Sequence, residues 1–176
     1  QIETTIAMKI SGILLLFFVV LSSCVKQAPQ LPANKTNRFD SAAVALVQVN
    51  ERLIESEDSL LEAYVSKSDS NFVKHETGFW YKINQRAAGT KPKANVSCSV
   101  NYSVYTLGGD FLFRKDEAIV VGKKQIIKGV EEALLMMHPG EKATLIVPWY
   151  LAYGMKGNPK EVDPYTSIVL YINYYK

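Results

Sequence analysis

Residues 122–154 constrain the fold of this 176-residue chain more than any other segment. They read GKKQIIKGVEEALLMMHPGEKATLIVPWYLAYG. A strand-like stretch runs into residues 126–129, and the apolar spacing that follows predicts a short helix over about 130–137. Pro139-Gly140 is typical of a turn, and residues 143–147 read as another strand. A single short helix between strands indicates a sheet that packs around it.

Alternation of apolar and polar residues predicts the other strands. Val96, Cys98, Val100, Tyr102 and Val104 recur at every second position, so they share one face of a strand over 96–106. On that face, Cys98 is expected to be a small buried hydrophobe. Further strands are expected at 77–83, 111–113, 118–121 and 167–175. The predicted fold class is α+β, with an antiparallel sheet curled around the short helix.

The N-terminus reads as an export signal. We expect the true start at Met8, because Lys9 and the twelve-residue apolar run 10–21 match a secretory signal. The run is too short for a transmembrane helix, which needs about 20 residues. Residues 21–24 (LSSC) resemble a bacterial lipobox, which predicts a signal peptide over 1–23 and lipidation of Cys24. The alternative is an ordinary signal peptide followed by an unrelated cysteine.

A tether and a helix are expected next. Residues 24–39 contain two prolines and no acidic residue, which favours a flexible tether on the periplasmic side of a membrane, expected to be the outer membrane. Asp40-Ser41 reads as a helix N-cap, and apolar residues at helical spacing continue to about Lys67, with a break expected near Ser56. This N-terminal helical segment (40–76) is expected to pack on the following domain or on a second copy, so a homodimer through helix 40–67 stays open.

Composition and motifs exclude several function classes. Twenty basic and 17 acidic residues give a net charge of +3, and a dense basic patch for nucleic acid is not expected. His75 and His138 lack metal-ligand spacing, and His138 is expected to be an exposed turn residue. No nucleotide or dinucleotide fingerprint is present, so neither a metal nor a cofactor is predicted.

Residues 77–176 resemble the FK506-binding-protein (FKBP) family of peptidyl-prolyl isomerases. The resemblance is carried by IIKGVEE at 126–132, LAYG at 151–154 and the closing strand SIVLYINYY at 167–175. It implies an FKBP-like fold for this domain and catalysis at Xaa-Pro bonds. That reaction needs an apolar cavity and a few hydrogen-bond donors, so it is compatible with the lack of titratable catalytic motifs.

The resemblance also implies a set of site residues. Tyr102, Ile127 and Tyr153 are expected to be catalytic: Tyr102 lines the pocket, while the Ile127 backbone N–H and the Tyr153 hydroxyl each bind a substrate carbonyl. The substrate-binding residues that it implies are Leu112, Phe113, Ile126, Val130, Val162 and Leu170.

The chain departs from the family pattern at several of these positions. Val130 stands where the family has a tryptophan floor, and Leu170 stands where it has an aromatic residue. The family's Phe-Asp pair aligns with Leu112-Phe113, or with Phe113-Arg114 after a one-residue shift, so its carboxylate is expected to be absent. These changes predict weaker isomerase activity and poor binding of macrolide inhibitors.

Three functions remain open at this stage. The first is a lipid-anchored isomerase that acts on proline-containing exported or envelope proteins. The second is a catalytically weak or inactive chaperone or assembly factor with the same pocket, because the overall layout is similar to the gliding-motility-associated FKBP-type lipoproteins of Bacteroidetes. The third is a structural periplasmic subunit whose contacts come from the helix at 40–67.

Overall fold

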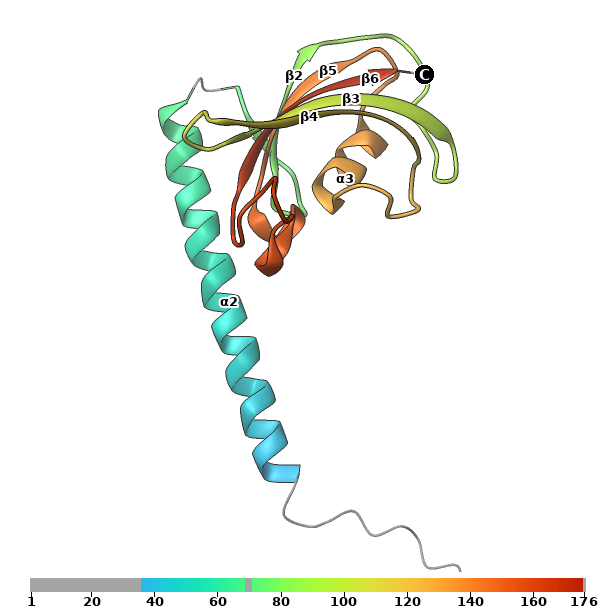
Figure 1. Cartoon of the computed structure of the whole chain (residues 1–176). Helices are drawn as coiled ribbons and strands as arrows, with labels where there is room; N and C mark the ends of the chain where they lie inside the picture. Colours follow the sequence, from blue (N-terminus) through green and yellow to red (C-terminus); the bar gives the residue numbers. More distant parts are fainter. Residues whose placement is uncertain (1–35, 69–70, 176) are drawn as a thin grey trace, which may run out of the picture. The chain divides into compact units, whose positions relative to one another are not determined.

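The computed structural model describes residues 36–68 and 71–175, with side chains from residue 41 onward, and shows an antiparallel sheet curled around a short helix (Figure 1). The strands are β1 (Val73–Lys74), β2 (Trp80–Gln85), β3 (Ser97–Thr106), β4 (Phe111–Val120), β5 (Lys142–Val147) and β6 (Ile168–Tyr175). The helices are α2 (Thr36–Lys67) and α3 (Lys128–Met136), with two 3₁₀ turns, η1 (Trp149–Leu151) and η2 (Gly154–Lys156). The sheet order is β1-β2-β5-β6-β3-β4, which confirms the predicted α+β class.

One face of the sheet and helix α3 form the main core. Alternate residues of β3, β5 and β6 point to this face, where α3 lies in the hollow of the sheet (Figure 1). Cys98 is 3% exposed in this core, which confirms it as a small buried hydrophobe. The fully buried side chains here include Val100, Val104, Leu134, Leu145, Ile168, Leu170 and Ile172.

The C-terminal part of α2 packs on the opposite face of the same sheet. The chain divides into compact units at residues 1–47 and 48–176, and this packing lies within the second unit. Leu61 and Val65 form a smaller buried cluster with Ile146 of β5 and Val169 of β6. Ile146 and Val169 alternate along their strands with residues of the main core, so they point to the other face of the sheet. Through this packing, residues 48–67 fold with the sheet as one unit.

Helix α2 differs from the prediction at two places. It begins at Thr36, so Asp40-Ser41 lies inside the helix and the predicted N-cap was wrong. It also continues through Ser56 without a break. Two serines of this helix bond back to the preceding turn: Ser59 Oγ donates to the Glu55 carbonyl and Ser66 Oγ to the Ala63 carbonyl, each at 2.9 Å.

Three strand predictions were also wrong. Residues 111–120 form one strand, because β4 lies at the sheet edge, where its charged residues reach solvent while the strand pairs with β3. The strand ends at Val120, so residues 121–127 are not strand-like but turn towards α3. The first predicted strand begins at Trp80 rather than at residue 77, because Gly78 has a φ of +110° in the turn that precedes it.

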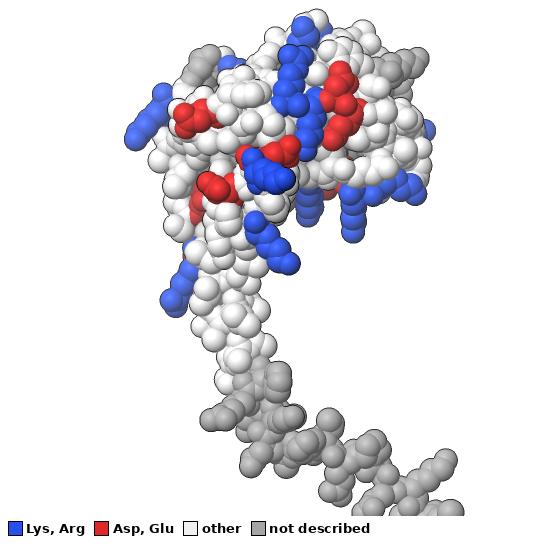
Figure 2. Space-filling view, viewed as in Figure 1, with Lys and Arg blue, Asp and Glu red and all other residues white. Residues whose placement is uncertain are grey.

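Charges are mixed on the face drawn in Figure 2, where basic and acidic side chains lie side by side over the sheet. Among residues 36–68 and 71–175, no helix combines the length and the apolarity that a bilayer crossing needs. The predicted signal peptide (1–23), the lipidation at Cys24 and most of the tether lie outside the described residues.

The packing of α2 can be tested with two neighbouring leucines. Leu61 is fully buried, whereas Leu60 is 51% exposed. We expect Leu61→Ala to lower the free energy of unfolding by about 2–5 kcal/mol, because it leaves a cavity between the helix and the sheet. Leu60→Ala, the matched control, should change stability by less than about 0.5 kcal/mol. Urea denaturation measures both, and equal effects would contradict the packing described above.

Candidate functional site

Three aromatic rings from distant segments line one end of the main core. Tyr102 of β3 and Phe113 of β4 meet edge to face, with ring centroids 6.4 Å apart and an interplanar angle of 76°. Phe113 makes a similar contact with Tyr153, at 6.2 Å and 74°. Phe113 therefore lies between the two tyrosines, in the T-shaped arrangement that aromatic pairs prefer. This contact places Phe113, rather than Leu112, beside the predicted catalytic tyrosines.

A carboxylate from another position of β4 lies beside these rings. The Tyr102 hydroxyl donates a hydrogen bond to Glu117 Oε2 at 3.1 Å. Glu117 belongs to β4, four residues after Phe113, so both side chains lie on the same face of the strand. The family's carboxylate is absent from residues 112–114, as expected, and Glu117 supplies a different carboxylate to the site.

Tyr153 lies two residues after the end of η1, immediately before η2, and is half-buried. Burial, followed by the negative charges of Glu161 and Glu117, raises the pKa of Tyr153 to about 12. Burial and Glu117 also raise the pKa of Tyr102. Both hydroxyls are thus protonated at neutral pH, and Tyr153 can donate a hydrogen bond to a ligand.

Ile126 and Ile127 occupy the turn that leads into α3. The Ile127 carbonyl accepts hydrogen bonds from the Val130 and Glu131 N–H groups, each at 3.1 Å, and so begins the helix. No hydrogen bond found within the described part of the chain uses the Ile127 N–H. This donor therefore lies at the helix start, available to a carbonyl group from outside.

Helix α3 reaches this position because Gly129 has no side chain. A Cβ at Gly129 would lie 2.5 Å from Val147 Cγ1 and 3.5 Å from the Leu151 carbonyl oxygen. The helix start, the end of β5 and turn η1 consequently meet at one point. Ile127 lies two residues before Gly129, and Tyr153 lies two residues after Leu151. The contact between Gly129 and Leu151 therefore brings Ile127 and Tyr153 to the same cavity.

The cavity between these elements has a volume of about 300 Å³. Its apolar and aromatic wall is bordered by charged residues, among which Lys115 forms an ion pair with Glu161 at 3.0 Å. Lys115 Nζ also lies 4.6 Å from the centroid of the Phe113 ring. The lining residues are Tyr102, Lys115, Glu117, Lys124, Gln125, Ile126, Ile127 and Tyr153.

The structure divides the predicted site residues into three groups. Tyr102, Ile126, Ile127 and Tyr153 line the cavity, and Phe113 contacts both tyrosine rings. Val130 and Leu170 do not line the cavity. Both side chains are 0% exposed and lie in the main core. Leu112 and Val162 line a separate cavity of about 470 Å³, together with Pro159 and Pro164.

Sequence reasoning missed four charged residues of the site, namely Lys115, Glu117, Lys124 and Glu161. A signal for the first two was present, because period-two alternation from Phe113 places them on the same face of an uninterrupted strand. Glu161 comes from the loop before β6, and its contact with Lys115 could not be read from local sequence. His138 was also misjudged, since its side chain is 28% exposed and lies 3.5 Å from the buried Glu141 carboxylate.

Comparison with known proteins identifies relatives of the domain. Residues 88–173 match the model of the FKBP-type peptidyl-prolyl cis-trans isomerase family. Peptidyl-prolyl cis-trans isomerase Mip of Coxiella burnetii is 32% identical over 99 residues, which cover 54% of this chain and 43% of Mip. Peptidyl-prolyl cis-trans isomerase FKBP10 of Mus musculus is 44% identical over 52 residues, 30% of this chain and 9% of FKBP10. The chain thus spans less than half the length of these relatives.

Solved structures share the fold. A peptidyl-prolyl cis-trans isomerase from Pseudomonas syringae pv. tomato superposes with a TM-score of 0.59 at 23% identity, over 72% of this chain and 93% of that one. The N-terminal domain of FKBP42 from Arabidopsis thaliana gives a TM-score of 0.55 at 25% identity, over 61% of this chain and 92% of that domain. These likenesses confirm the FKBP-like fold that the sequence predicted.

The electrostatics of the cavity can be tested through the ionisation of Tyr153. In the wild-type protein, Tyr153 should ionise with a midpoint of about pH 12. Glu117→Gln should lower this pKa part of the way towards its ordinary value, because one negative charge is removed while burial remains. NMR of ring-labelled tyrosine, assigned with Tyr153→Phe, measures the change.

Glu131→Gln provides the control, since Glu131 is engaged with the Lys124 N–H and does not contribute to the shift at Tyr153. An unchanged Tyr153 midpoint in Glu117→Gln would show that the Glu117 charge does not act on the cavity.

Proposed function

We propose that this chain catalyses cis–trans isomerisation of Xaa-Pro bonds, because residues 88–173 match the model of the FKBP-type peptidyl-prolyl cis-trans isomerase family. The observation that carries the proposal is the cavity formed by Tyr102, Ile127 and Tyr153, with Phe113 between the tyrosines. It combines apolar surface with two hydrogen-bond donors that are free to meet a peptide. Prolyl isomerisation requires such apolar surface and hydrogen-bond donors, and it needs no titratable catalytic group.

The barrier to rotation about a prolyl bond comes from amide resonance and is about 20 kcal/mol. A planar amide is polar, whereas the twisted amide at the top of the barrier has lost resonance and part of its charge separation. An apolar cavity with little water therefore favours the twisted form over the planar one. The proline ring would lie against Phe113 and Ile126, where branched and aromatic side chains exclude water.

Two donors would hold the peptide while the bond rotates. The Ile127 N–H would bind one substrate carbonyl at the helix start, where the helix dipole strengthens the interaction. The Tyr153 hydroxyl, protonated because burial raises its pKa, would bind a second carbonyl. With the two flanking carbonyls fixed, rotation is confined to the prolyl bond between them.

Glu117 gives the site a negative charge next to Tyr102. Because the Tyr102 hydroxyl already donates to Glu117, this tyrosine presents its ring and its oxygen lone pair to a ligand rather than a donor proton. We infer that Glu117 fixes the Tyr102 ring as one wall of the cavity. Tyr153 is then the hydroxyl donor of the pair.

A binding function without turnover is the second candidate. It is favoured by the small side chains beneath the cavity, where Val130 and Leu170 give less aromatic surface than the family pattern has. A chaperone or assembly factor for envelope machinery, including gliding motility, would hold proline-containing segments in the same cavity. Such a protein would bind the peptides used below but would not accelerate their isomerisation.

We also propose that the protein is a lipoprotein that acts on exported or envelope proteins from the periplasmic face of a membrane, expected to be the outer membrane. The support is the sequence LSSC at residues 21–24, which resembles a lipobox, followed by a proline-containing tether. Lipid on Cys24 would hold the cavity near proteins that have just crossed the inner membrane.

The enzyme proposal is tested with the full chain in detergent micelles and a series of short peptides that includes Leu-Pro and Phe-Pro. We expect the wild-type protein to raise the isomerisation rate above the uncatalysed rate. Tyr153→Phe removes the hydroxyl donor, whereas Ile127→Ala keeps the backbone N–H and removes apolar side-chain surface from the cavity. Each should lower kcat/KM by about tenfold. Circular dichroism confirms that each variant is folded.

Tyr171→Phe is the matched control, because Tyr171 is 51% exposed and its side chain lies outside the cavity. It should keep the wild-type rate. Binding without acceleration in the folded wild-type protein would favour the second candidate. If the folded protein neither binds the peptides nor accelerates their isomerisation, both functions are excluded.

The anchor is tested separately by expressing the chain in a bacterium and measuring the mass of the mature N-terminal peptide. We expect cleavage before Cys24 and a mass increase that corresponds to acyl chains. Cys24→Ala should abolish both the modification and membrane association. An unmodified Cys24 in the mature protein would refute the lipoprotein assignment.

A further inference from the structure

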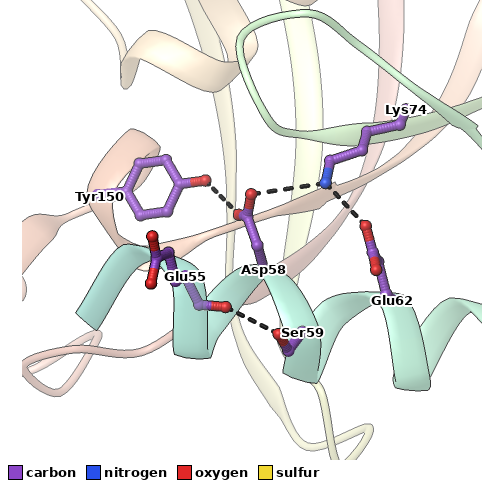
Figure 3. Close-up of polar contacts among 6 residues, drawn as sticks. All are labelled: Glu55, Asp58, Ser59, Glu62, Lys74 and Tyr150. Carbon is purple, nitrogen blue, oxygen red and sulfur yellow. Dashed lines mark hydrogen bonds and ion pairs between the residues drawn. The ribbon is translucent and has the colours of Figure 1, made fainter. Parts of the chain in front are cut away.

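Helix α2 contacts turn η1 through a charged cluster that the proposed reaction does not use. The Tyr150 hydroxyl donates to Asp58 Oδ1 at 2.6 Å, and Lys74 Nζ lies 3.5 Å from Asp58 Oδ2 (Figure 3). Lys74 also pairs with Glu62 at 3.0 Å, one turn further along the helix. Asp58 thus lies between Tyr150 and Lys74, and all four residues belong to the unit 48–176.

A second link joins the same helix to the same turn. The Ser167 hydroxyl donates to the Glu57 carboxylate, while Ser167 Oγ accepts a hydrogen bond from the Trp149 N–H at 2.8 Å. Ser167 is 6% exposed, so this relay is shielded from water. Asp58 therefore binds the Tyr150 side chain of η1. Glu57 is linked through Ser167 to the backbone N–H of Trp149 in the same turn.

The fit of Tyr150 depends on a glycine. A Cβ at Gly78 would lie 2.7 Å from the Tyr150 hydroxyl oxygen, so only glycine lets this hydroxyl reach Asp58. Burial and the neighbouring Asp58 carboxylate raise the pKa of Tyr150, which keeps the hydroxyl a donor throughout the physiological range. Gly78 therefore leaves room for the Tyr150 hydroxyl, and Asp58 accepts its hydrogen bond.

Turn η1 is short, and it ends two residues before Tyr153. The Leu151 and Ala152 N–H groups donate to the Pro148 carbonyl at 2.9 and 3.1 Å, and Leu151 is 5% exposed. Only two residues, Leu151 and Ala152, separate Tyr150 from Tyr153. A displacement of Tyr150 would therefore reach Tyr153 through a single turn of hydrogen-bonded backbone.

We propose that Asp58 and Tyr150 are positioning residues: through their hydrogen bond, helix α2 fixes the orientation of the Tyr153 hydroxyl in the proline cavity. This inference rests on the proposed function for its kinetic readout. It makes the segment before the isomerase domain a working part of the site, although no residue of that segment lines the cavity.

The test compares four variants of the full chain. Tyr150→Phe removes the donor and keeps the ring, and Asp58→Ala removes the acceptor. Asp58→Asn retains an oxygen that can accept from Tyr150. Glu62→Gln is the matched control, because it weakens the shorter ion pair of the same lysine and leaves the Tyr150 contact intact.

We expect Tyr150→Phe and Asp58→Ala to lower kcat/KM by about three- to tenfold, with most of the loss in kcat. The double variant should lose no more than either single variant, because both remove the same hydrogen bond. Asp58→Asn should recover most of the rate, and Glu62→Gln should match the wild type. Rates are measured at a temperature at which all variants are folded.

An NMR signal provides a readout that does not depend on turnover. The ring resonances of Tyr153, assigned with Tyr153→Phe, should move in Tyr150→Phe and Asp58→Ala but not in Glu62→Gln. Lower thermal stability with an unchanged Tyr153 resonance and unchanged kcat/KM would overturn the inference, because the contact would then be purely structural. A wild-type chain without turnover would contradict the proposed function, and the Tyr153 resonance would still decide the positioning role.

Discussion

The close approach of Gly129 to Val147 determines where the two halves of the site can lie. With no side chain at Gly129, the first turn of α3 rests directly on the end of β5 and on the Leu151 carbonyl. Ile127 lies two residues before this contact, and Tyr153 lies two residues after Leu151. The cavity is therefore a consequence of one helix packing closely against one strand. A larger residue would move the helix and separate the two donors.

The sheet serves the site from both of its faces. On the inner face, β3 and β4 supply Tyr102, Phe113 and Glu117 by period-two alternation, and α3 closes the core behind them. On the outer face, the end of α2 packs on Ile146 and Val169 and contacts η1 through Asp58. The cavity combines aromatic and aliphatic surface with charged residues, among which Glu117 accepts a hydrogen bond from the wall residue Tyr102.

Much of the fold could be predicted from sequence, because strand alternation and the spacing around 122–154 are local signals. Tyr102, Ile127 and Tyr153 were found through a family resemblance, and the structure brings them to one cavity. Glu117 was missed because the alignment was searched for a carboxylate next to the phenylalanine, whereas an unbroken β4 supplies it four residues later. The Asp58–Tyr150 contact joins residues 92 apart in sequence, and no local pattern encodes it.

We propose that the cavity between β3, β4, α3 and η1 binds a prolyl bond and promotes its rotation. Two-dimensional exchange NMR on a Leu-Pro peptide, with a catalytic amount of the full chain in micelles, tests this at equilibrium. We expect exchange cross-peaks between the cis and trans isomers, together with shifts of the Ile127 amide and Tyr153 ring signals. Exchange at the uncatalysed rate, or shifts confined to residues outside this cavity, would contradict it.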